Sequence, residues 1–372
     1  MPLYLGLMSG TSLDGVDAVL ANVDSTARPG LHIRAHAHAP FSAALRSELL
    51  ALNTPGADEL HRCALAANAL ATCYAGLVQA LLTEHGLHGE AIRAIGAHGQ
   101  TVRHRPGEFD GRGYTLQLLN GALLAELTNI DVVCDFRSRD VAAGGQGAPL
   151  VPAFHAAMFG LAGKAVAVLN LGGISNLSLI EIDGSVRGFD CGPANALLDA
   201  WCERHTGRPF DHGGAWAAGG QVLPTLLQSM LAEPYLQKRP PKSTGRDLFH
   251  LEWLASHLAA HAPHANPRDV QATLAEFSAC AVANDMRRHG ACASQLLICG
   301  GGTFNDDLMQ RLRSRLPGIQ VSSTADHDLP PMQVEAAAFA WLAHAFTERQ
   351  PGNRVDVTGA TGLRVLGALY PR

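Results

Sequence analysis

The sequence predicts an α/β protein with two similarly organised domains. Its 372 residues exceed the about 150 of a typical domain. Short β-rich runs alternate with helical patterns along the chain, which is typical of α/β layers. A strand, a turn rich in glycine and serine and a second strand open each half. We therefore expect a boundary near 155–164, between domains at 1–155 and 156–350, with the tail 351–372 available to pack on the first domain.

The first half is expected to begin with strands at 3–8 and 16–23, joined by a turn of Ser, Thr, Gly and Asp. Leucine and alanine recur at helical spacing over 58–85, which predicts one long amphipathic helix. Residues 91–99 predict a buried strand that ends in glycine. The other elements expected here are strands at 114–119 and 130–134 and helices at 121–128 and 149–159, the last starting at a proline.

The second half repeats this opening with strands at 165–173 and 176–182, followed by a short strand at 185–189. A buried strand at 295–299 runs into three consecutive glycines. Apolar spacing predicts helices at 194–206, 221–231, 252–261, 270–288, 306–316 and 334–349. The halves share this pattern without a repeated sequence.

Composition and charge narrow the classes of function. Lys plus Arg number 28 and Asp plus Glu 33, and this net charge of −5 argues against nucleic acid and against an anionic membrane surface. The N-terminus lacks a signal-peptide pattern, and the apolar runs are shorter than the ~20 residues of a membrane span. Eight cysteines without a CxxC pair indicate reduced thiols, so we expect a cytoplasmic protein that does not enter membranes.

Glycine is enriched, at 39 of 372 residues, or about 10% against a usual ~7%. Three loops, at 9–15, 172–175 and 300–303, combine glycine with Ser or Thr. Without a Cβ such a loop can turn sharply and present successive N–H groups to a phosphate, although each loop alone is more often a plain turn. The chain has no GxxxxGK[ST], and 300–302 lacks GxGxxG spacing, so neither a P-loop nor a dinucleotide fold fits.

Two hairpins with phosphate-binding tips and a late glycine-rich turn together resemble the acetate and sugar kinase, heat-shock ATPase and actin superfamily. Seven longer motifs, with GALYP near the end, are similar to those of the anhydro-N-acetylmuramic acid kinase family. These motifs are GLMSGTSLDGVD (6–17), GAHGQTVRH (96–104), DFRSRDVAAGGQGAPLVP (135–152), NLGGISN (170–176), GFDCGPAN (188–195), PPKSTGRDLF (240–249) and CGGGTFN (299–305).

The resemblance implies two related actin-like ATPase domains, each a mixed sheet with flanking helices, and an ATP cleft between them. It implies a kinase that uses ATP and Mg²⁺ to phosphorylate O6 of 1,6-anhydro-N-acetylmuramic acid while water opens the anhydro bridge. The product is N-acetylmuramic acid 6-phosphate, an intermediate of peptidoglycan recycling and amino-sugar catabolism. A homodimer is also implied, for which the apolar C-terminal helix and tail offer a face.

Two carboxylates are the catalytic candidates. Asp190 follows the strand at 185–189 and precedes a Gly-Pro, so it lies at the end of an element. The resemblance through the GFDCGP motif implies that it is the base that activates water at the anomeric carbon. Its plainer role is the N-cap of the helix at 194–206. Glu335 lies at the start of an apolar helix, where it either orients the water or sugar or simply favours the helix dipole.

The resemblance assigns the ATP contacts to the three glycine loops and their flanks. The first tip is Met8-Ser9-Gly10-Thr11, where many relatives of the superfamily carry an aspartate early in the turn. We therefore expect the carboxylate that holds Mg²⁺ through water to be Asp14 or Asp17 instead. His36 and His38 share a strand face, and an exposed polar face is favoured over a metal site there. The ATP-binding candidates are Gly10, Thr11, Ser12, Leu13, Asp14, Gly15, Val16, Asp17, Asn170, Gly172, Gly173, Ser175, Asn176, Gly300, Gly301, Gly302 and Asn305.

Polar residues after two buried strands of the first half are the sugar-binding candidates, because binding groups collect at strand ends in α/β folds. An arginine there suits the lactyl carboxylate, with an interdomain salt bridge as the alternative. Lys242 and Arg246 lie in a basic loop that either contacts phosphate, becomes ordered on domain closure or is solvated. The sugar-binding candidates are Ser9, His98, Gln100, Thr101, Arg137 and Asp140.

Two rival functions share the expected fold. An ATP-driven interaction protein would hydrolyse ATP regardless of any sugar, but the chain has no long partner-binding domain. The second rival is a kinase for another small molecule, such as acetate or glycerol. A panel of acceptors assayed for ATP consumption would distinguish it from a kinase for the anhydro sugar.

Overall fold

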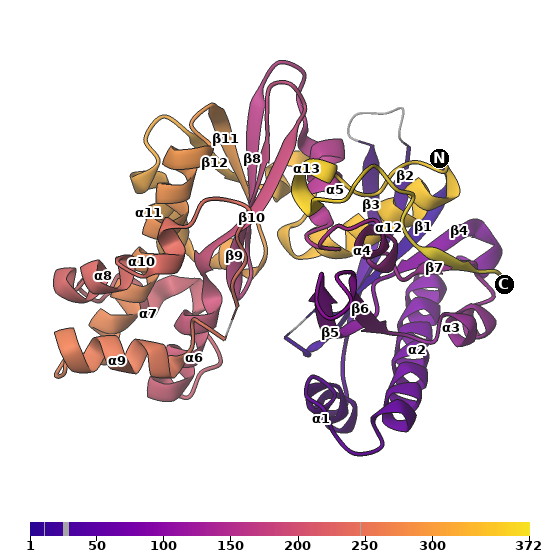
Figure 1. Ribbon diagram of the computed structural model, residues 1–372, viewed down its shortest axis with the longest axis horizontal. Helices are drawn as coiled ribbons and strands as arrows, with labels where there is room; N and C mark the ends of the chain where they lie inside the picture. Colours follow the sequence, from indigo (N-terminus) through magenta and orange to yellow (C-terminus); the bar gives the residue numbers. More distant parts are fainter. Residues whose placement is uncertain (11, 25–29, 246) are drawn as a thin grey trace. The chain divides into compact units, whose positions relative to one another are not determined.

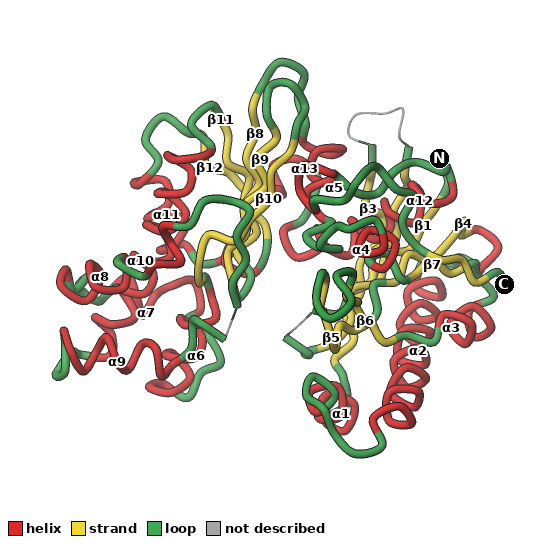
Figure 2. The backbone as a smooth tube through the Cα atoms, in the orientation of Figure 1, coloured by secondary structure: helices red, strands yellow, loops and turns green. Residues whose placement is uncertain are grey.

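The computed structural model describes residues 1–10, 12–24, 30–245 and 247–372. These residues form two compact units, shown in sequence colours in Figure 1 and by element type in Figure 2. Unit 1 contains Met1–Phe159 and Gln333–Arg372, and unit 2 contains Gly160–Met332. Unit 2 is therefore one continuous segment, whereas unit 1 is assembled from both ends of the chain.

Unit 1 is built on a six-stranded mixed sheet in the order β13-β7-β4-β1-β2-β3. The strands β1, β2 and β3 are antiparallel neighbours, β4 and β7 continue the sheet parallel to β1, and β13 pairs antiparallel with β7. β5 and β6 form a separate two-stranded sheet. The strands are β1 (Leu3–Met8), β2 (Gly15–Val23), β3 (Leu31–Pro40), β4 (Ile92–Ala97), β5 (Gln100–Pro106), β6 (Gly113–Leu118), β7 (Val132–Cys134) and β13 (Ala368–Tyr370).

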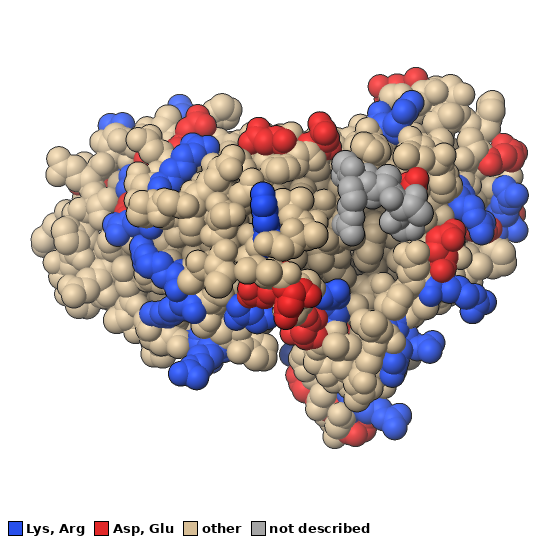
Figure 3. All heavy atoms as spheres, turned by 90° about the horizontal axis from the view of Figure 1, so that it is seen from above, with Lys and Arg blue, Asp and Glu red and all other residues tan. Residues whose placement is uncertain are grey.

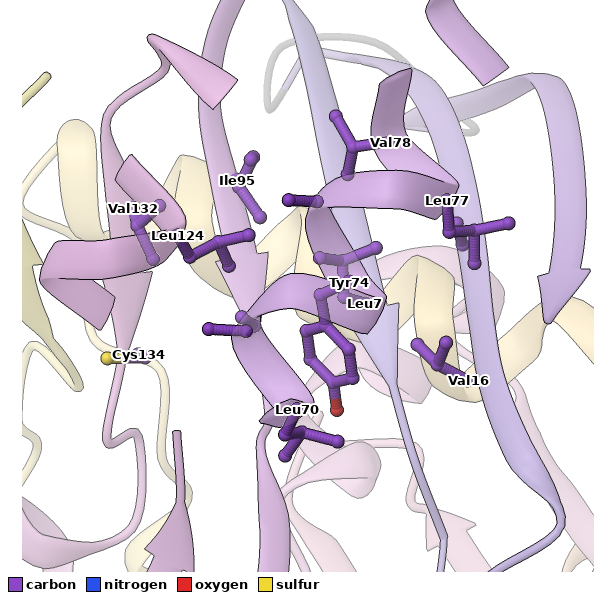
Figure 4. Close-up of a cluster of buried hydrophobic side chains, with 14 of the residues drawn as sticks. Leu7, Val16, Leu70, Tyr74, Leu77, Val78, Ile95, Leu124, Val132 and Cys134 are labelled. Carbon is purple, nitrogen blue, oxygen red and sulfur yellow. The ribbon is translucent and has the colours of Figure 1, made fainter. Parts of the chain in front are cut away.

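The long helix α2 (Glu59–Glu84) forms one side of the core of unit 1. It packs Tyr74 and Val78 into a cluster with Leu7 of β1 and Ile95 of β4 (Figure 4). By length and composition alone α2 could cross a membrane, but half of its most apolar window is buried inside the protein. We therefore interpret α2 as a core helix of unit 1.

The helix α12 (Val334–Thr347) lies directly on the other face of this sheet. A Cβ on Gly6 of β1 would lie 1.9 Å from the carbonyl oxygen of Ala336, and one on Gly96 of β4 would lie 2.0 Å from that of Phe339. Glycine is thus required for the approach. This contact places α12 in unit 1, whereas the sequence analysis assigned 334–349 to the second domain and offered this apolar helix as a dimer face.

The other helices of unit 1 are short. They are α1 (Ala43–Ala51), α3 (Gly121–Thr128), α4 (Ser138–Ala142), α5 (Val151–Phe159) and α13 (Val355–Thr358), with a 3-10 turn η1 (Gly89–Ala91).

Unit 2 has a five-stranded sheet in the order β10-β9-β8-β11-β12. Its first three strands are antiparallel, and β11 and β12 continue parallel to β8. The order β3-β2-β1-β4-β7 of unit 1 has the same directions, which confirms the prediction of two related domains with mixed sheets. The strands of unit 2 are β8 (Ala165–Leu171), β9 (Ile174–Ile180), β10 (Val186–Pro193), β11 (Ala293–Cys299) and β12 (Gln320–Ser323).

The helix α10 (Pro267–His289) joins the two hydrophobic clusters of unit 2. Its Val282 and Met286 pack against the sheet, whereas Leu274 and Phe277 pack among the other helices. Those helices are α6 (Asn195–Thr206), α7 (Ala215–Ala218), α8 (Pro224–Leu231), α9 (Leu251–His261) and α11 (Asp306–Arg315), with 3-10 turns η2 (His212–Gly214), η3 (Pro234–Gln237), η4 (Gly301–Phe304), η5 (Thr324–His327) and, at the border of the units, η6 (Pro331–Gln333).

Most expected elements are present, with three differences that matter. The strand expected at 185–189 extends to Pro193, because its pairing with β9 continues past Asp190. α5 begins at Val151, so Pro149 precedes the helix. The sequence analysis did not identify α1, β5, β12 or β13, of which the last two have only four and three residues.

The surface charge is mixed. On the face that Figure 3 shows, basic and acidic side chains are interspersed among uncharged ones, in keeping with the small net charge of −5.

Candidate functional site

The tip of the β1–β2 hairpin is fixed from within unit 1. The Ser9 hydroxyl is buried, lies 2.6 Å from the Tyr74 hydroxyl and donates to the carbonyl oxygen of Gly99. Gln100 Nε2 donates to the carbonyl oxygen of Gly10 at 3.1 Å. The predicted sugar-binding residues Ser9 and Gln100 thus hold the backbone of the predicted phosphate loop. Thr11 lies outside the described residues.

Asp17, a predicted metal ligand, lies in β2 opposite Met8 of β1 and His38 of β3. Its Oδ1 is 3.2 Å from both His36 Nε2 and His38 Nδ1, so the two histidines of this strand face meet a carboxylate after all. Asp14, the other candidate, accepts a hydrogen bond from Ser12 at 2.7 Å and is exposed. Among the described residues, no group of three or more His, Cys, Asp or Glu could by itself hold a metal ion.

His98 and Arg137 form a buried pair beside the end of β4. Arg137 donates through Nε to His98 Nε2 at 3.0 Å and through Nη1 to the carbonyl oxygen of Gly147 at 2.8 Å. Because Nε2 accepts, the imidazole is neutral, and burial together with the Arg137 charge lowers the pKa of His98 to about 3. Burial also lowers the pKa of Arg137 to about 10, against the opposing charges of Glu335 and Asp140.

Glu335 lies in the first turn of α12 and belongs to the same electrostatic group. Burial raises its pKa, the charge of Arg137 lowers it, and the carboxylate of Asp17 raises it again. Asp17, a predicted metal ligand, and Glu335, predicted to orient the water or sugar, are therefore close enough in unit 1 for the charge of Asp17 to affect the pKa of Glu335.

Asp140 is fully buried, and both of its carboxylate oxygens accept hydrogen bonds from the protein. Oδ2 accepts from the Gly147 N–H at 2.8 Å, and Oδ1 accepts from Asn353 Nδ2 at 2.7 Å and Thr358 Oγ1 at 2.8 Å. A Cβ on Gly145 would lie 2.2 Å from Oδ2. This geometry ties the glycine loop to the C-terminal segment, and it favours a structural role over the expected sugar contact.

Thr101 lies on the β5–β6 sheet opposite Gln117. Its hydroxyl accepts a hydrogen bond from Gln117 Nε2 at 3.1 Å, and the same nitrogen donates to Thr115 at 2.8 Å. Thr101 therefore begins a polar row on this sheet that the sequence analysis did not find.

In unit 2 the tip of the β8–β9 hairpin is attached to the start of α6. The N–H of Asn195 donates to the carbonyl oxygen of Gly172, and the N–H groups of Ala194 and Ala196 donate to that of Gly173, each at 3.0 Å. Ser175 is buried and donates to the carbonyl oxygen of Gly192. These contacts fix the glycine tip against the start of α6 through its carbonyl oxygens, and its binding of phosphate stays a prediction.

The third glycine loop packs on the end of β8. Gly300 has a φ of +81°, and a Cβ there would lie 2.3 Å from Asn170 Oδ1, whereas Gly301 meets no atom closer than 3.9 Å. Asn305 is buried and caps α11 by accepting from the Leu308 N–H. The structure thus brings the second and third predicted phosphate loops together, with the Asn305 side chain committed to the helix.

Asp190 lies within β10, next to Asn176 of β9, which in turn pairs with Asn170 of β8. Directly opposed residues share a sheet face, so these three polar side chains form one row. The N-cap of α6 is Ala194, which excludes the plainer role considered for Asp190.

The carboxylate of Asp190 is held by the segment that follows the Pro240–Pro241 pair. Its Oδ2 accepts from Ser243 Oγ at 2.8 Å and from the Thr244 N–H at 3.0 Å. Burial raises its pKa, and the bonds from Thr244 and Ser243 and the charge of Lys242 oppose that rise. Within the described residues both of these hydrogen bonds are made to Oδ2, and none to Oδ1.

Lys242 differs from its expected place in a basic loop. Its ammonium donates to Asp285 Oδ2 at 2.8 Å, and both side chains are almost fully buried. The motif around Lys242 drew attention in the sequence, but its partner lies 43 residues away on α10 and carried no signal of its own. Arg246, the other basic residue of this loop, lies outside the described residues.

Comparison with known proteins gives a consistent result. The sequence matches the family model "Anhydro-N-acetylmuramic acid kinase" over residues 2–372. A protein of that name from Variovorax paradoxus (strain S110) is 61% identical, covering 99% of this chain and 99% of its own. One from Cupriavidus metallidurans is 56% identical, covering 100% of this chain and 98% of its own.

The solved structure of the Acidaminococcus fermentans (R)-2-hydroxyglutaryl-CoA dehydratase component A is similar in fold. Its TM-score is 0.50 at 10% identity, over 91% of this chain and 96% of that one. The duplicated sheet plan and this likeness agree with the expected actin-like ATPase fold. The match over nearly every residue and the high identity of the relatives place the chain in the anhydro-N-acetylmuramic acid kinase family.

Proposed function

We propose that this chain catalyses the reaction named by its family, in which ATP phosphorylates O6 of 1,6-anhydro-N-acetylmuramic acid while water adds at C1. The O6–P bond forms as the bond from the γ-phosphorus to ADP breaks, and the C1–O6 bond breaks as the water oxygen bonds to C1. The product is N-acetylmuramic acid 6-phosphate. The family match over residues 2–372 supports this substrate, and we place the reaction in cytoplasmic peptidoglycan recycling.

The environment of Asp190 is the observation that carries the mechanism. Hydrolysis of a glycosidic bond ordinarily needs an acid for the leaving oxygen and a base for water. Here the phosphoryl group captures the leaving oxygen, so the base is the part that remains necessary. Asp190 has one oxygen fixed by Ser243 and Thr244, and burial raises its pKa, which makes it a stronger base for the water proton.

In unit 1, Arg137 and Glu335 are assigned to the sugar and its water. The Arg137 guanidinium suits the lactyl carboxylate through paired hydrogen bonds. Glu335 lies within the influence of Arg137 and orients the water or the sugar. His98, Gln100, Thr101 and Ser9 support this region, with Asp140 holding the adjacent glycine loop.

The three glycine loops and their flanks, at 10–17, 170–176 and 300–302, are assigned to ATP. Asp17 in β2 and Asp14 at the hairpin tip are carboxylates, the oxygen ligands that Mg²⁺ prefers. The ion would neutralise charge on the β- and γ-phosphates. We assign Asp17 or Asp14 to hold it through water.

We further propose that the chain is a homodimer, as the family resemblance implies. Leu369 and Tyr370 on the edge strand β13 are 45% and 40% exposed, which leaves apolar surface for a partner copy. The molar mass in solution, measured by light scattering, tests this assignment.

The test of function is ADP release by the full-length protein with ATP, Mg²⁺ and a panel of acceptors. We expect turnover with 1,6-anhydro-N-acetylmuramic acid and little with acetate, glycerol or glucose. In H₂¹⁸O the label should enter the product at C1. ATP hydrolysis that ignores the sugar would favour the ATP-driven interaction protein instead.

A further inference from the structure

A buried ion pair lies beneath the Asp190 segment. Lys242 Nζ donates to Asp285 Oδ2 at 2.8 Å, and the two side chains are only 1% and 2% exposed. Taking both charges out of water costs free energy that their attraction often fails to recover. An apolar pair of the same volume would stabilise the fold at least as well, so stability alone is a weak reason for these two charges.

Lys242 is bound to the Asp190 strand through its backbone. The N–H of Asp190 donates to the carbonyl oxygen of Lys242 at 3.1 Å. The next two residues of the segment, Ser243 and Thr244, donate to Asp190 Oδ2. The position of those two donors therefore depends on where Lys242 is held.

The side chain of Lys242 is fixed at its far end. It reaches Asp285 on α10 and lies over two aromatic rings, with Nζ 5.3 Å from the ring centre of Tyr235 and 5.7 Å from that of Phe189. Tyr235 in turn donates its hydroxyl proton to the carbonyl oxygen of Asp190 at 2.8 Å. The strand, η3 and α10 are thus joined around one ammonium group.

We propose that Lys242 and Asp285 are a positioning pair: they anchor the 242–244 segment against β10, so that its two donors, Ser243 and Thr244, together with the lysine charge keep the Asp190 carboxylate ionised for water activation. This inference rests on the proposed role of Asp190 as the base. It assigns a role to a lysine that the sequence placed in a phosphate-binding or solvated loop, and to an aspartate that the sequence did not single out.

Three further titratable groups near Asp190, namely Cys191, Tyr235 and His289, are uncharged near neutral pH. Burial raises the pKa of Cys191 in β10 and of Tyr235 in η3, so the thiol and the phenol keep their protons. Burial lowers the pKa of His289 on α10, which leaves that imidazole neutral. Asp285 carries the charge opposite to Lys242 and is held by it.

The sign of the effect follows from these contacts. Burial raises the pKa of Asp190, and the hydrogen bonds from Thr244 and Ser243 and, after them, the charge of Lys242 lower it. Losing the anchor that holds the two donors, together with the lysine charge, therefore raises the pKa further. A base with a raised pKa is protonated over a wider acidic range. The acid limb of kcat/KM should then move to higher pH, by on the order of one pH unit for a nearby charge.

The experiment measures kcat and KM against pH for the full-length protein with ATP, Mg²⁺ and the anhydro sugar. Lys242→Met and the double variant Lys242→Met/Asp285→Asn should both move the acid limb of kcat/KM upward. Lys242→Arg keeps the charge and should restore the limb toward the wild-type position. The double variant leaves no unpaired buried charge, so it remains informative if the single variant fails to fold.

Lys238→Met is the matched control. Lys238 is exposed and its Nζ lies 5.8 Å from the ring centre of Tyr235, so this change removes a nearby positive charge without disturbing the buried pair. Its profile should follow the wild type. A loss of kcat/KM by one factor at every pH in the double variant, with the limb unmoved, would mean a merely structural pair and overturn the proposal.

Failure of the proposed function looks different. If the wild type does not turn over the anhydro sugar, or if Asp190→Asn stays active, the role of Asp190 is wrong. If the wild type is active and depends on Asp190 while the Lys242 variants keep the wild-type limb, only the positioning pair is wrong.

Discussion

The Ser9 hydroxyl lies 2.6 Å from the Tyr74 hydroxyl inside the core of unit 1, so a residue of the hairpin tip is bonded to the middle of the longest helix. Tyr74→Phe removes this hydrogen bond, so the Ser9 hydroxyl keeps only its hydrogen bond to the carbonyl oxygen of Gly99. We expect a loss of about 1 kcal/mol in the free energy of unfolding and a higher KM for ATP. Urea unfolding and initial rates measure both, with Tyr114→Phe on the exposed β6 surface as control. Unchanged stability would show that the bond contributes nothing.

Asp190→Asn should keep ATP binding and lose sugar-dependent ADP release by a factor of ~10² to 10⁴, the usual contribution of a general base. The amide can still accept from Ser243 and Thr244, so the fold should survive. Calorimetric titration with a non-hydrolysable ATP analogue and a coupled ADP assay separate the two effects. Asp183→Asn, in the exposed turn before β10, is the control. Full activity in Asp190→Asn would exclude it as the base.

Gly6→Ala tests the contact between β1 and α12. The added Cβ would lie 1.9 Å from the Ala336 carbonyl oxygen and 2.6 Å from the Ala340 nitrogen, both backbone atoms that cannot move aside. We expect destabilisation of roughly 3 kcal/mol or more. Gly76→Ala in α2, which meets no atom within 4 Å, should instead stabilise by about 0.5–1 kcal/mol. Thermal and urea unfolding measure the stability of both variants. A Gly6→Ala variant as stable as the wild type would contradict the close contact between β1 and α12.

His98 should make unit 1 sensitive to acid. Its pKa is about 3 in the folded protein against 6.5 for the free side chain, so the unfolded chain binds a proton that the native state does not. Stability therefore rises with pH between about 3 and 6.5 and is lost as the pH falls through that window. His98→Gln should flatten the dependence of the unfolding midpoint on pH, while the exposed His85→Gln should retain it. An equally steep profile in His98→Gln would assign the acid sensitivity elsewhere, for instance to buried His155.

Removal of divalent ions by EDTA should abolish turnover, and added Mg²⁺ should restore it. If Asp17 holds the ion, Asp17→Asn raises the Mg²⁺ concentration for half-maximal rate by about tenfold or more, as weakened metal ligation commonly does. Asp24→Asn is the matched control, because Asp24 directly follows the last residue of the same strand, β2. If Asp17→Asn keeps the wild-type Mg²⁺ requirement while Asp14→Asn needs more Mg²⁺, the metal ligand is Asp14 at the hairpin tip and not Asp17.

The sequence predicted well the elements that have a strong local signal. The strands at 3–8 and 165–173 and the helix at 58–85 have apolar residues at clear spacing, and their ends agree with β1, β8 and α2 within two residues. β12 and β13 are too short to show a period. The early end assigned to β10 has another cause: Asp190 and Gly192 look like a strand end, but the register with β9 carries the strand past them.

The candidate site shows the same difference between features with a local sequence signal and features that depend on long-range contacts. Glycine loops and the motifs around them identified the segments, yet not which side chains would face a ligand. Asp140 lies in a motif, but two donors from the distant C-terminal segment, Asn353 and Thr358, and one from Gly147 of the same motif engage its oxygens. Lys242 was found by its motif, whereas Asp285 and Tyr74 were not, because they act across the fold from helices whose sequence reads as core.

The position of α12 has a consequence for biogenesis. Residues 160–332 are a continuous insert that holds all of unit 2, whereas unit 1 needs α12, made after this insert, on β1 and β4 before its sheet is covered on both faces. During synthesis from the N-terminus, β1 and β4 are thus made early, but the helix that covers them is made only after all of unit 2. We expect unit 2 to gain protease resistance as soon as its own segment is free, and nascent chains that stop before residue 333 to leave β1 and β4 exposed to chaperones.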